Sequence, residues 1–499
     1  MAWALAAMQA FAADSLATMP SDLAVTVYRA PARGAGSIDL DQLAGFALVS
    51  ETRTVHLPAG VSRLRFEGVA DGIEPASAIV TGLSEGIIEK NREGKLLSPA
   101  ALMAAAAGKS LTLLRTDKRT GKQRRLAGTI RSDAQGGVVF ETAEGIEALR
   151  CSGLPESFSF TDAADLSATP TLSVLVRSHE AVTRTVTLSY LARGFDWAAD
   201  YIATLSADGK TMDLGAWVTL ANGNGVGFPS ARTQVVAGRV NRESGEVEPL
   251  DVGGPILAQC WPRGSTSDPP GTLQIDRASP GNARDVSFAM TQTLRMAAPA
   301  ALQEVIVTAG KKMEQEQLGD LKLYRVPDRT TLASRQSKQV RLMDRLAVPV
   351  SFVYSADLAA DQTTVSAPAS RLLRTMNNTA NHLGLPLPSG RVAVFATRGS
   401  EQLLQRESGM RDLAVGEEVE IDMGDSPDVQ VAADANRVDI SNAGAQEIHF
   451  ELRLRLSAGA RVIRADHKIG SKNGRPMFRV TVPAHDTATV RYLTQRAGG

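Results

Sequence analysis

The sequence predicts a mainly β protein, made of antiparallel β-sandwich domains with one small inserted SH3-like barrel and one or two short helices. Apolar and polar residues alternate over many segments, such as residues 182–190 and 450–457. A period of two is typical of strands that bury one face and wet the other. Turns containing glycine or proline separate these segments, and helix-forming runs are few.

Length and charge narrow the class of protein further. The 499 residues suggest roughly three domains. Apolar residues make up 43% and charged residues 22%, as in ordinary globular proteins. The 54 Lys and Arg residues balance 54 Asp and Glu residues. This neutrality argues against a nucleic-acid partner, whose binding needs cations on phosphates. It also lowers solubility, which favours a bound partner or oligomer.

The N-terminus indicates export. Residues 1–13 are uncharged and apolar, and Ala10 and Ala12 form an A-x-A pattern before Ala13, as in a signal peptide. A basic n-region is missing, and a short buried helix is the alternative. The run is too short to cross a bilayer, which takes about 20 residues. No later run is long and charge-free enough to cross a membrane, so we expect no transmembrane helix. The signal-like N-terminus predicts a periplasmic or secreted location.

The strand pattern predicts the order of domains. A first sandwich part occupies residues 14–96 and continues over 153–252, with strands near 52–66 and 172–191 pairing around an insertion. The insertion, 97–152, contains strands at 111–115, 126–131, 138–141 and 146–149 on tight turns, which favours the SH3-like barrel. A Pro/Gly-rich loop and linker covers 253–318, and a C-terminal sandwich covers 319–499.

One short helix is expected, and a second segment is a further candidate. In the first, Ser98 is the N-cap, Pro99 the first residue and Gly108 the stop. The second covers residues 370–383, where Leu372, Leu373 and Met376 would share a face.

Several short motifs resemble an uncharacterised bacterial domain-of-unknown-function family that includes relatives of mucoidy inhibitor A. These motifs are residues 25–28 (VTVY), 57–60 (LPAG), 64–69 (LRFEGV), 97–99 (LSP), 113–116 (LLRT), 197–201 (WAADY), 320–324 (DLKLY), 331–333 (TLA), 387–392 (LPSGRV) and 415–419 (VGEEV). Their order spans the chain from about residue 22. The resemblance implies an exported bacterial β protein and carries no activity. Residues 225–228 (GVGF) depart from the Asp-Trp that such proteins often have there.

Motifs for catalysis or metal binding are few. Residues 103–110 approach a P-loop, but Met103 replaces its first glycine and a strand follows. Neither G-x-S-x-G nor H-E-x-x-H occurs, and the six histidines lack metal spacing. Asp422, Asp425 and Asp428 could hold calcium, but Gly424 favours a turn with aspartate caps. Basic residues at 118–125 fit a solvated hairpin. We therefore expect no catalytic residue, metal or cofactor.

Two further features are candidate sites. Cys151 and Cys260 match no metal spacing and either form a disulfide or are unrelated buried thiols. The segment 304–309 resembles one near the N-terminus of TonB-dependent transporters and would add to a partner's sheet edge, or else be an ordinary strand. The residues of this binding candidate are Glu304, Val305, Ile306, Val307 and Thr308.

Three functions stay open at this point. The first is a non-enzymatic binding or scaffold protein of the bacterial envelope, with an envelope protein or a glycan as partner. The second is an envelope hydrolase whose site assembles from distant carboxylates. The third is a component of a TonB-linked or secretion assembly.

Overall fold

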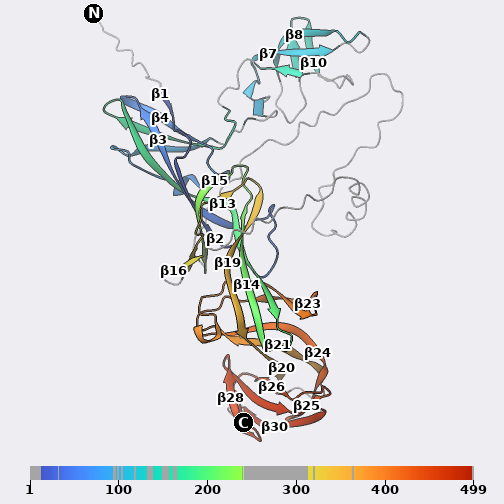
Figure 1. Ribbon diagram of the computed structural model, residues 1–499. Helices are drawn as coiled ribbons and strands as arrows, with labels where there is room; N and C mark the ends of the chain where they lie inside the picture. Colours follow the sequence, from blue (N-terminus) through green and yellow to red (C-terminus); the bar gives the residue numbers. More distant parts are fainter. Residues whose placement is uncertain are drawn as a thin grey trace, which may run out of the picture. The chain divides into compact units, whose positions relative to one another are not determined.

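The computed structural model describes residues 13–31, 33–93, 97, 101–102, 105–116, 120–131, 139–148, 157–160, 166–238, 240, 313–318, 321–361, 365–399 and 401–496. It is mainly β, as the alternating pattern predicted (Figure 1). The chain divides into two compact units. Unit 1 comprises Met1–Arg92, Thr171–Pro249 and Lys311–Gly499, and unit 2 comprises Glu93–Pro170 and Leu250–Gly310.

Unit 2 contains a five-stranded antiparallel sheet around a small core of Leu111, Leu113, Ile130 and Phe140. Its order is β10 (Gly145–Ala148), β9 (Val139–Thr142), β8 (Gln123–Ile130), β7 (Ser110–Thr116) and β11 (Ser157–Ser159). The first four strands lie where the sequence predicted strands. Of the first expected helix, residues 101, 102 and 105 are helical, and Gly108 has a φ of +75°, which suits a helix stop.

Unit 1 begins with a four-stranded sheet in the order β1 (Ala13–Leu16), β4 (Gly60–Glu67), β12 (Thr171–Ser178) and β6 (Ile87–Glu93). β4 and β12 pair antiparallel, although the insertion separates them in sequence. This is the pairing that the two alternating segments predicted.

A twelve-stranded sheet follows, in which β13 is the central strand. Its main path is β16 (Glu314–Leu318), β17 (Leu321–Arg325), β15 (Phe228–Ala237), β2 (Asp22–Tyr28), β3 (Gly45–Leu57), β13 (Val182–Leu205), β14 (Thr211–Asn222) and β19 (Gln336–Pro349). β18 (Thr330–Leu332) pairs with β15, β5 (Ile79–Thr81) and β22 (Gly390–Arg398) pair with β13, and β23 (Glu401–Met410) pairs with β22. One short 3-10 helix, Pro75–Ser77, precedes β5.

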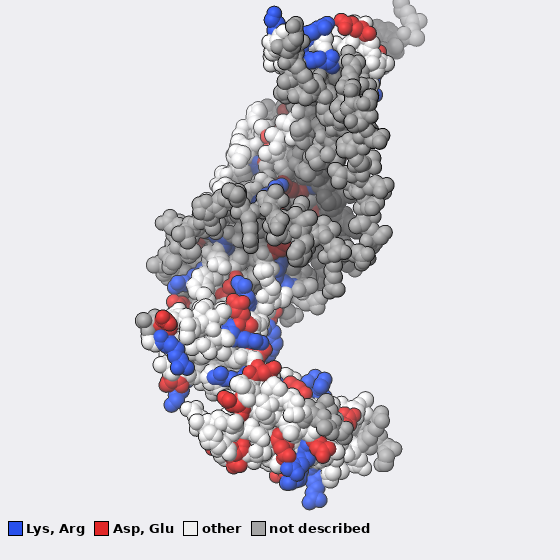
Figure 2. Space-filling model, turned by 90° about the vertical axis from the view of Figure 1, so that its right-hand side faces the viewer, with Lys and Arg blue, Asp and Glu red and all other residues white. Residues whose placement is uncertain are grey.

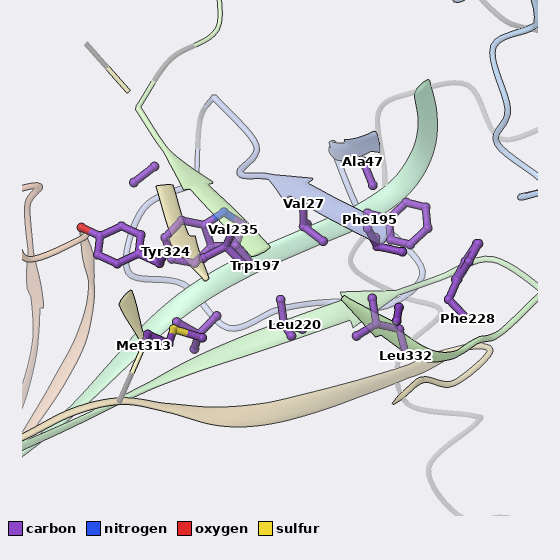
Figure 3. Packing of buried hydrophobic residues seen from close by; sticks show 14 of the residues in the cluster. Val27, Ala47, Phe195, Trp197, Leu220, Phe228, Val235, Met313, Tyr324 and Leu332 are labelled. Atoms are coloured by element: carbon purple, nitrogen blue, oxygen red, sulfur yellow. The ribbon is translucent and has the colours of Figure 1, made fainter. Parts of the chain in front are cut away.

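Alternating side chains of these strands form the main core. Val186, Leu188 and Tyr190 of β13 are buried, as their period-two spacing predicted. Figure 3 shows Trp197 of β13 and Leu220 of β14 in the same layer, with side chains from β2, β15, β17 and β18.

A nine-stranded sheet forms the C-terminal part. Its order is β27 (Ala460–Ala465), β30 (Asp486–Arg496), β25 (Arg437–Asn442), β24 (Glu418–Asp434), β21 (Val365–Met376), β20 (Ser351–Ala359), β26 (Ile448–Arg455), β29 (Arg475–Val482) and β28 (Ile469–Lys472). The rings of Phe478 and Tyr492 stack with centroids 6.1 Å apart, in a second core. The predicted helix at 370–383 is wrong. Strand β21 continues to Met376, and a 3-10 turn covers Thr379–Asn381. Leu373 and Thr375 are both buried, two residues apart, which is the spacing of a strand and not of a helix.

The same asparagine-centred corner occurs in both large sheets. The side-chain amide of Asn222 donates to the carbonyls of Val226 and Ala333, at 2.9 and 3.1 Å. That of Asn442 donates to the carbonyls of Gln446 and Pro483, at 2.8 and 2.9 Å. In each case the side-chain oxygen accepts from the amide two residues later.

The strands around the two corners also correspond. Asn222 lies opposite Gln336 and Asn442 opposite Asp486 in the antiparallel register. Arg335 and His485, each one residue earlier, have φ of 49° and 54°. The strands β14, β15, β18 and β19 therefore repeat as β25, β26, β29 and β30.

We expect Asn222→Ala and Asn442→Ala to destabilise their own sheets by about 1–3 kcal/mol each, because each leaves buried carbonyl groups without a donor. Native-state hydrogen exchange of β14 and of β25 would measure the two effects separately. The exposed neighbour Ser441→Ala should change stability by less than about 0.5 kcal/mol. A large loss at only one of the two asparagines would contradict the equivalence of the corners.

Candidate functional site

Some of the candidate residues lie outside the described residues. These are the strand candidate Glu304–Thr308 and both cysteines, Cys151 and Cys260. The Pro/Gly-rich segment 253–299 and residues 1–12 of the expected signal remnant, 1–13, lie outside them as well. Those expectations stay predictions.

The aspartate group lies within strand β24 and not at a turn between strands. The backbone amide of Gly424 donates to Asp422 Oδ1 at 2.7 Å, so an aspartate does cap a backbone amide there. Asp422, Asp425 and Asp428 are all exposed. Within the described ranges, no three acidic, His or Cys side chains are placed to hold a metal ion. A bulge therefore replaces the expected turn, because the β21–β24 register shifts at Asp425.

Residues from three of the family-like motifs meet two others, Arg29 and Asp412, in one place. We call this group the motif cluster: Arg29, Trp197, Tyr324, Ser389 and Asp412. Arg29 Nη2 lies 2.6 Å from Asp412 Oδ2, and its Nη1 donates to Ser389 Oγ at 2.7 Å. The guanidinium lies 5.4 Å from the Trp197 ring centroid. Trp197 donates to the carbonyl of Val236 at 3.1 Å and meets Tyr324 edge-on. These bonds join β2, β13, β17 and the start of β22.

The surroundings of Gly390, in the motif 387–392, leave no room for a side chain. Gly390 lies opposite Ala199 in the parallel β13–β22 pair. A Cβ at this position would lie 2.0 Å from the carbonyl oxygen of Ala199, so only glycine fits without a backbone shift. Tyr201 OH donates to the carbonyl of Pro388 at 2.7 Å in the same place. The motif residues thus hold two strands together.

A fully buried ion pair lies between β3 and the four-stranded sheet. Arg53 Nε donates to Glu51 Oε2 at 2.8 Å, and Tyr190 OH donates to Glu51 Oε1 at 2.7 Å. Arg53 also donates to the carbonyl of Glu67 at 2.8 Å. Glu51 and Arg53 are each 1% exposed. Burial raises the pKa of Glu51, against the attraction of Arg53.

A second group of charges, the ion-pair cluster, consists of Glu418, Glu420, Glu451, Arg374, Arg453 and Lys472. Arg374 binds Glu451 with two hydrogen bonds of 2.8 and 2.7 Å. Lys472 Nζ lies 2.7 Å from Glu420 Oε1 and also contacts Glu418. Arg453 donates to both Glu420 and Glu451, at 3.2 and 3.0 Å. The three carboxylates and three cations cancel in charge.

Two carboxylates of this cluster, those of Glu420 and Glu451, are held in their ionised form. Burial raises the pKa of Glu451, but hydrogen bonds from Arg374 and Arg453 outweigh it and hold this pKa well below its usual range. The pKa of Glu420 is lowered in the same way by Lys472 and Arg374, against the effect of burial. A general acid needs a pKa near the working pH. The cluster is therefore suited to a structural role.

The alternating pattern placed Glu418, Glu420 and Glu451 on a wet face. Glu451 is only 2% exposed, so its burial was missed. His467 Nδ1 and Asp466 Oδ1 are 2.7 Å apart, because both residues lie in a bend after β27 and not on opposite faces of a strand. On the face in Figure 2, acidic and basic side chains of the described residues are interspersed.

Glu451 should make stability depend on pH in acid. Its folded pKa lies below the unfolded value of about 4.3, so its contribution is full above that pH and is lost as pH falls further. We expect Glu451→Gln to lower the local stability of the C-terminal sheet at neutral pH, with a smaller difference from wild type near pH 3. Native-state hydrogen exchange of β26 amides across this range would measure the difference. The exposed Glu447→Gln is the control, and a pH-independent loss in Glu451→Gln would contradict the account.

Strand β23 presents an exposed edge over its first residues. It hydrogen-bonds to β22 alone among the described strands, and residues 401–407 are all exposed. Nearer its end, Arg406 lies 3.4 Å from Asp422 of β24, so that part of the strand already has a neighbour. Leu403 and Leu404 are 46% and 53% exposed. The register shifts opposite Val394 and Phe395, which leaves Gln405 as an extra residue. A bulge and charged neighbours are features that hinder unselective edge pairing.

Comparison with known proteins adds no relative: no family model matches the chain, and no curated protein matches it. In the described part of the chain, no helix has the length and apolarity needed to cross a membrane.

Proposed function

We propose that this chain is an exported, non-enzymatic binding or scaffold protein of the bacterial envelope. The observation that carries this proposal is the edge strand β23, which presents Leu403 and Leu404 to solvent on an otherwise polar strand. Exposed edge strands are surfaces to which an extended segment of another protein can add, with backbone bonds giving affinity and side chains giving selectivity.

Export is supported by the N-terminal sequence. Residues 1–13 are apolar and uncharged, and Ala10 and Ala12 form an A-x-A pattern, as in a signal peptide.

The proposed membership of the bacterial family rests on residues that now have roles. Trp197, Tyr201, Tyr324 and Ser389 come from three motifs of the resemblance and join neighbouring strands in and beside the motif cluster. Motifs that support a shared fold are what a family relationship of this kind would preserve.

The hydrolase alternative is less well supported. The ion-pair cluster brings carboxylates together from β24 and β26. Each of them is bound by Arg or Lys, and the pKa values of Glu420 and Glu451 are lowered. Glycosidase-type chemistry needs one carboxylic acid with a raised pKa.

The binding proposal can be tested by a charge on the edge strand. We expect Leu404→Asp to abolish co-purification of an envelope partner that wild type retains, because an unpaired carboxylate would have to be buried at the contact. Leu346→Asp is the matched control, since Leu346 of β19 is 65% exposed and lies on another edge. Equal retention of every partner by both variants would contradict a role for β23.

A further inference from the structure

Strands β21 and β24 change the core that they face along their length. Leu373 and Val419 pack into the main core of unit 1. Ala369 and Val429, farther along the same two strands, pack into the C-terminal core. The β21–β24 register shifts on both sides of Ser370, between these two groups. The extra residues of these shifts lie on β24, between Asp422 and Gln430. Bulges bend a strand and increase its twist, so β24 bends where the pair passes from one core to the other.

The backbone hydrogen bonds between β21 and β24 do not by themselves fix this bend firmly. β24 adopts the left-handed region at Gly424, whose φ is +83°. Ser370 Oγ reaches Asp425 Oδ1 only at 3.5 Å, and both groups are exposed. An interrupted ladder has fewer backbone bonds that resist a change of angle. Other contacts must therefore hold the angle between the two parts.

The ion-pair cluster crosses the bend. Arg374 and Glu420 lie on the segments that border the main core, next to Leu373 and Ile421. Glu451 and Lys472 lie on β26 and β28, in the part of the sheet that surrounds the C-terminal core. The two-bond contact of Arg374 with Glu451 and the Lys472–Glu420 bond therefore connect opposite sides. Paired charged hydrogen bonds fix direction as well as distance.

We infer that the ion-pair cluster is a clamp that sets the angle between two parts of unit 1. We call them the main sandwich, which surrounds the main core, and the C-terminal sandwich, which surrounds the C-terminal core. Its interior is largely dry: the side chains of Arg374, Arg453 and Lys472 are 12%, 14% and 14% exposed. Its rim contains Asp357, Arg475 and Arg479, which are about half exposed or more. A clamp of this kind keeps the binding edge β23 at a set angle to the C-terminal sandwich.

Distance measurement between the two sandwiches tests the clamp. Spin labels at Ser337→Cys of β19 and Thr487→Cys of β30 report across the bend, in a full chain with Cys151→Ser and Cys260→Ser. Ser337 and Thr487 are exposed and occupy equivalent positions of the two repeats. We expect one narrow distance distribution for the intact clamp and a broader or shifted one for Glu451→Gln.

Two further variants make the result decisive. Arg479→Met removes a cation that is 74% exposed and lies 3.5 Å from Glu451 on the same side of the bend, so the distribution should stay narrow. Lys472→Met removes one crossing contact and should broaden it, and this variant replaces Glu451→Gln if the latter does not fold. An unchanged narrow distribution in a folded crossing variant would overturn the clamp, as would equal broadening in Arg479→Met.

Discussion

Arg53→Met is expected to lower the stability of the sheet that contains β3 and β4 by about 3–5 kcal/mol, because it leaves a buried carboxylate without its counter-charge. Glu51 would keep only the hydrogen bond from Tyr190. The carbonyl of Glu67 would lose its donor as well. The chain has several cores, so one global unfolding free energy is not well defined. Native-state hydrogen exchange of β3 amides would measure the local loss.

The double variant Glu51→Leu with Arg53→Met is the matched control. Removing both charges replaces the pair with apolar side chains, which is often close to neutral in stability. We therefore expect the double variant to recover most of the loss. A double variant as unstable as Arg53→Met alone would show that the packing of Arg53 against Phe66, and not the lost charge, is what matters.

Trp197→Ala is expected to cost about 3–5 kcal/mol, as large aromatic truncations in a core do. The side chain is fully buried, its ring meets Tyr324, and its Nε1 donates to the carbonyl of Val236. Loss of the ring would also remove the apolar surface beneath Arg29. Hydrogen exchange of β15 and β17 amides would report the loss.

Trp217→Ala is the control for this prediction. Trp217 lies on β14 of the same sheet, is only partly buried, and has Arg341 at 5.8 Å from its ring. A smaller loss is expected, because less apolar surface is removed from burial. Equal losses in the two tryptophan variants would contradict the assignment of Trp197 to the motif cluster.

The fold class followed from the sequence because side-chain alternation is a local signal. Val419 and Ile421 are buried while Glu418 and Glu420 point the other way, as the pattern predicted. The signal failed at residues 370–383, where Leu372, Leu373 and Met376 fit both a helical face and an irregular strand. The buried residues Ala369, Leu373 and Thr375 keep a period of two. Leu372 and Met376 are apolar as well but are not buried, so the sequence showed no alternation there.

The charged clusters could not be predicted in the same way. Arg374 and Glu451 are 77 residues apart, and their contact depends on strand order and on the bend. Arg53 and Glu51 are two residues apart on one strand and were therefore on one face, but the sequence did not show that this face is covered. Burial of a charge depends on which sheet covers it, and this is decided by topology.

The central claim is that this β protein works outside the cytoplasm. Its most direct test is the intact mass and cell fraction of the chain isolated from cells that produce it naturally. The account predicts a chain that begins at Ala13, recovered from the periplasmic or extracellular fraction. A folded chain that retains Met1 and stays with the cytoplasmic fraction would contradict it.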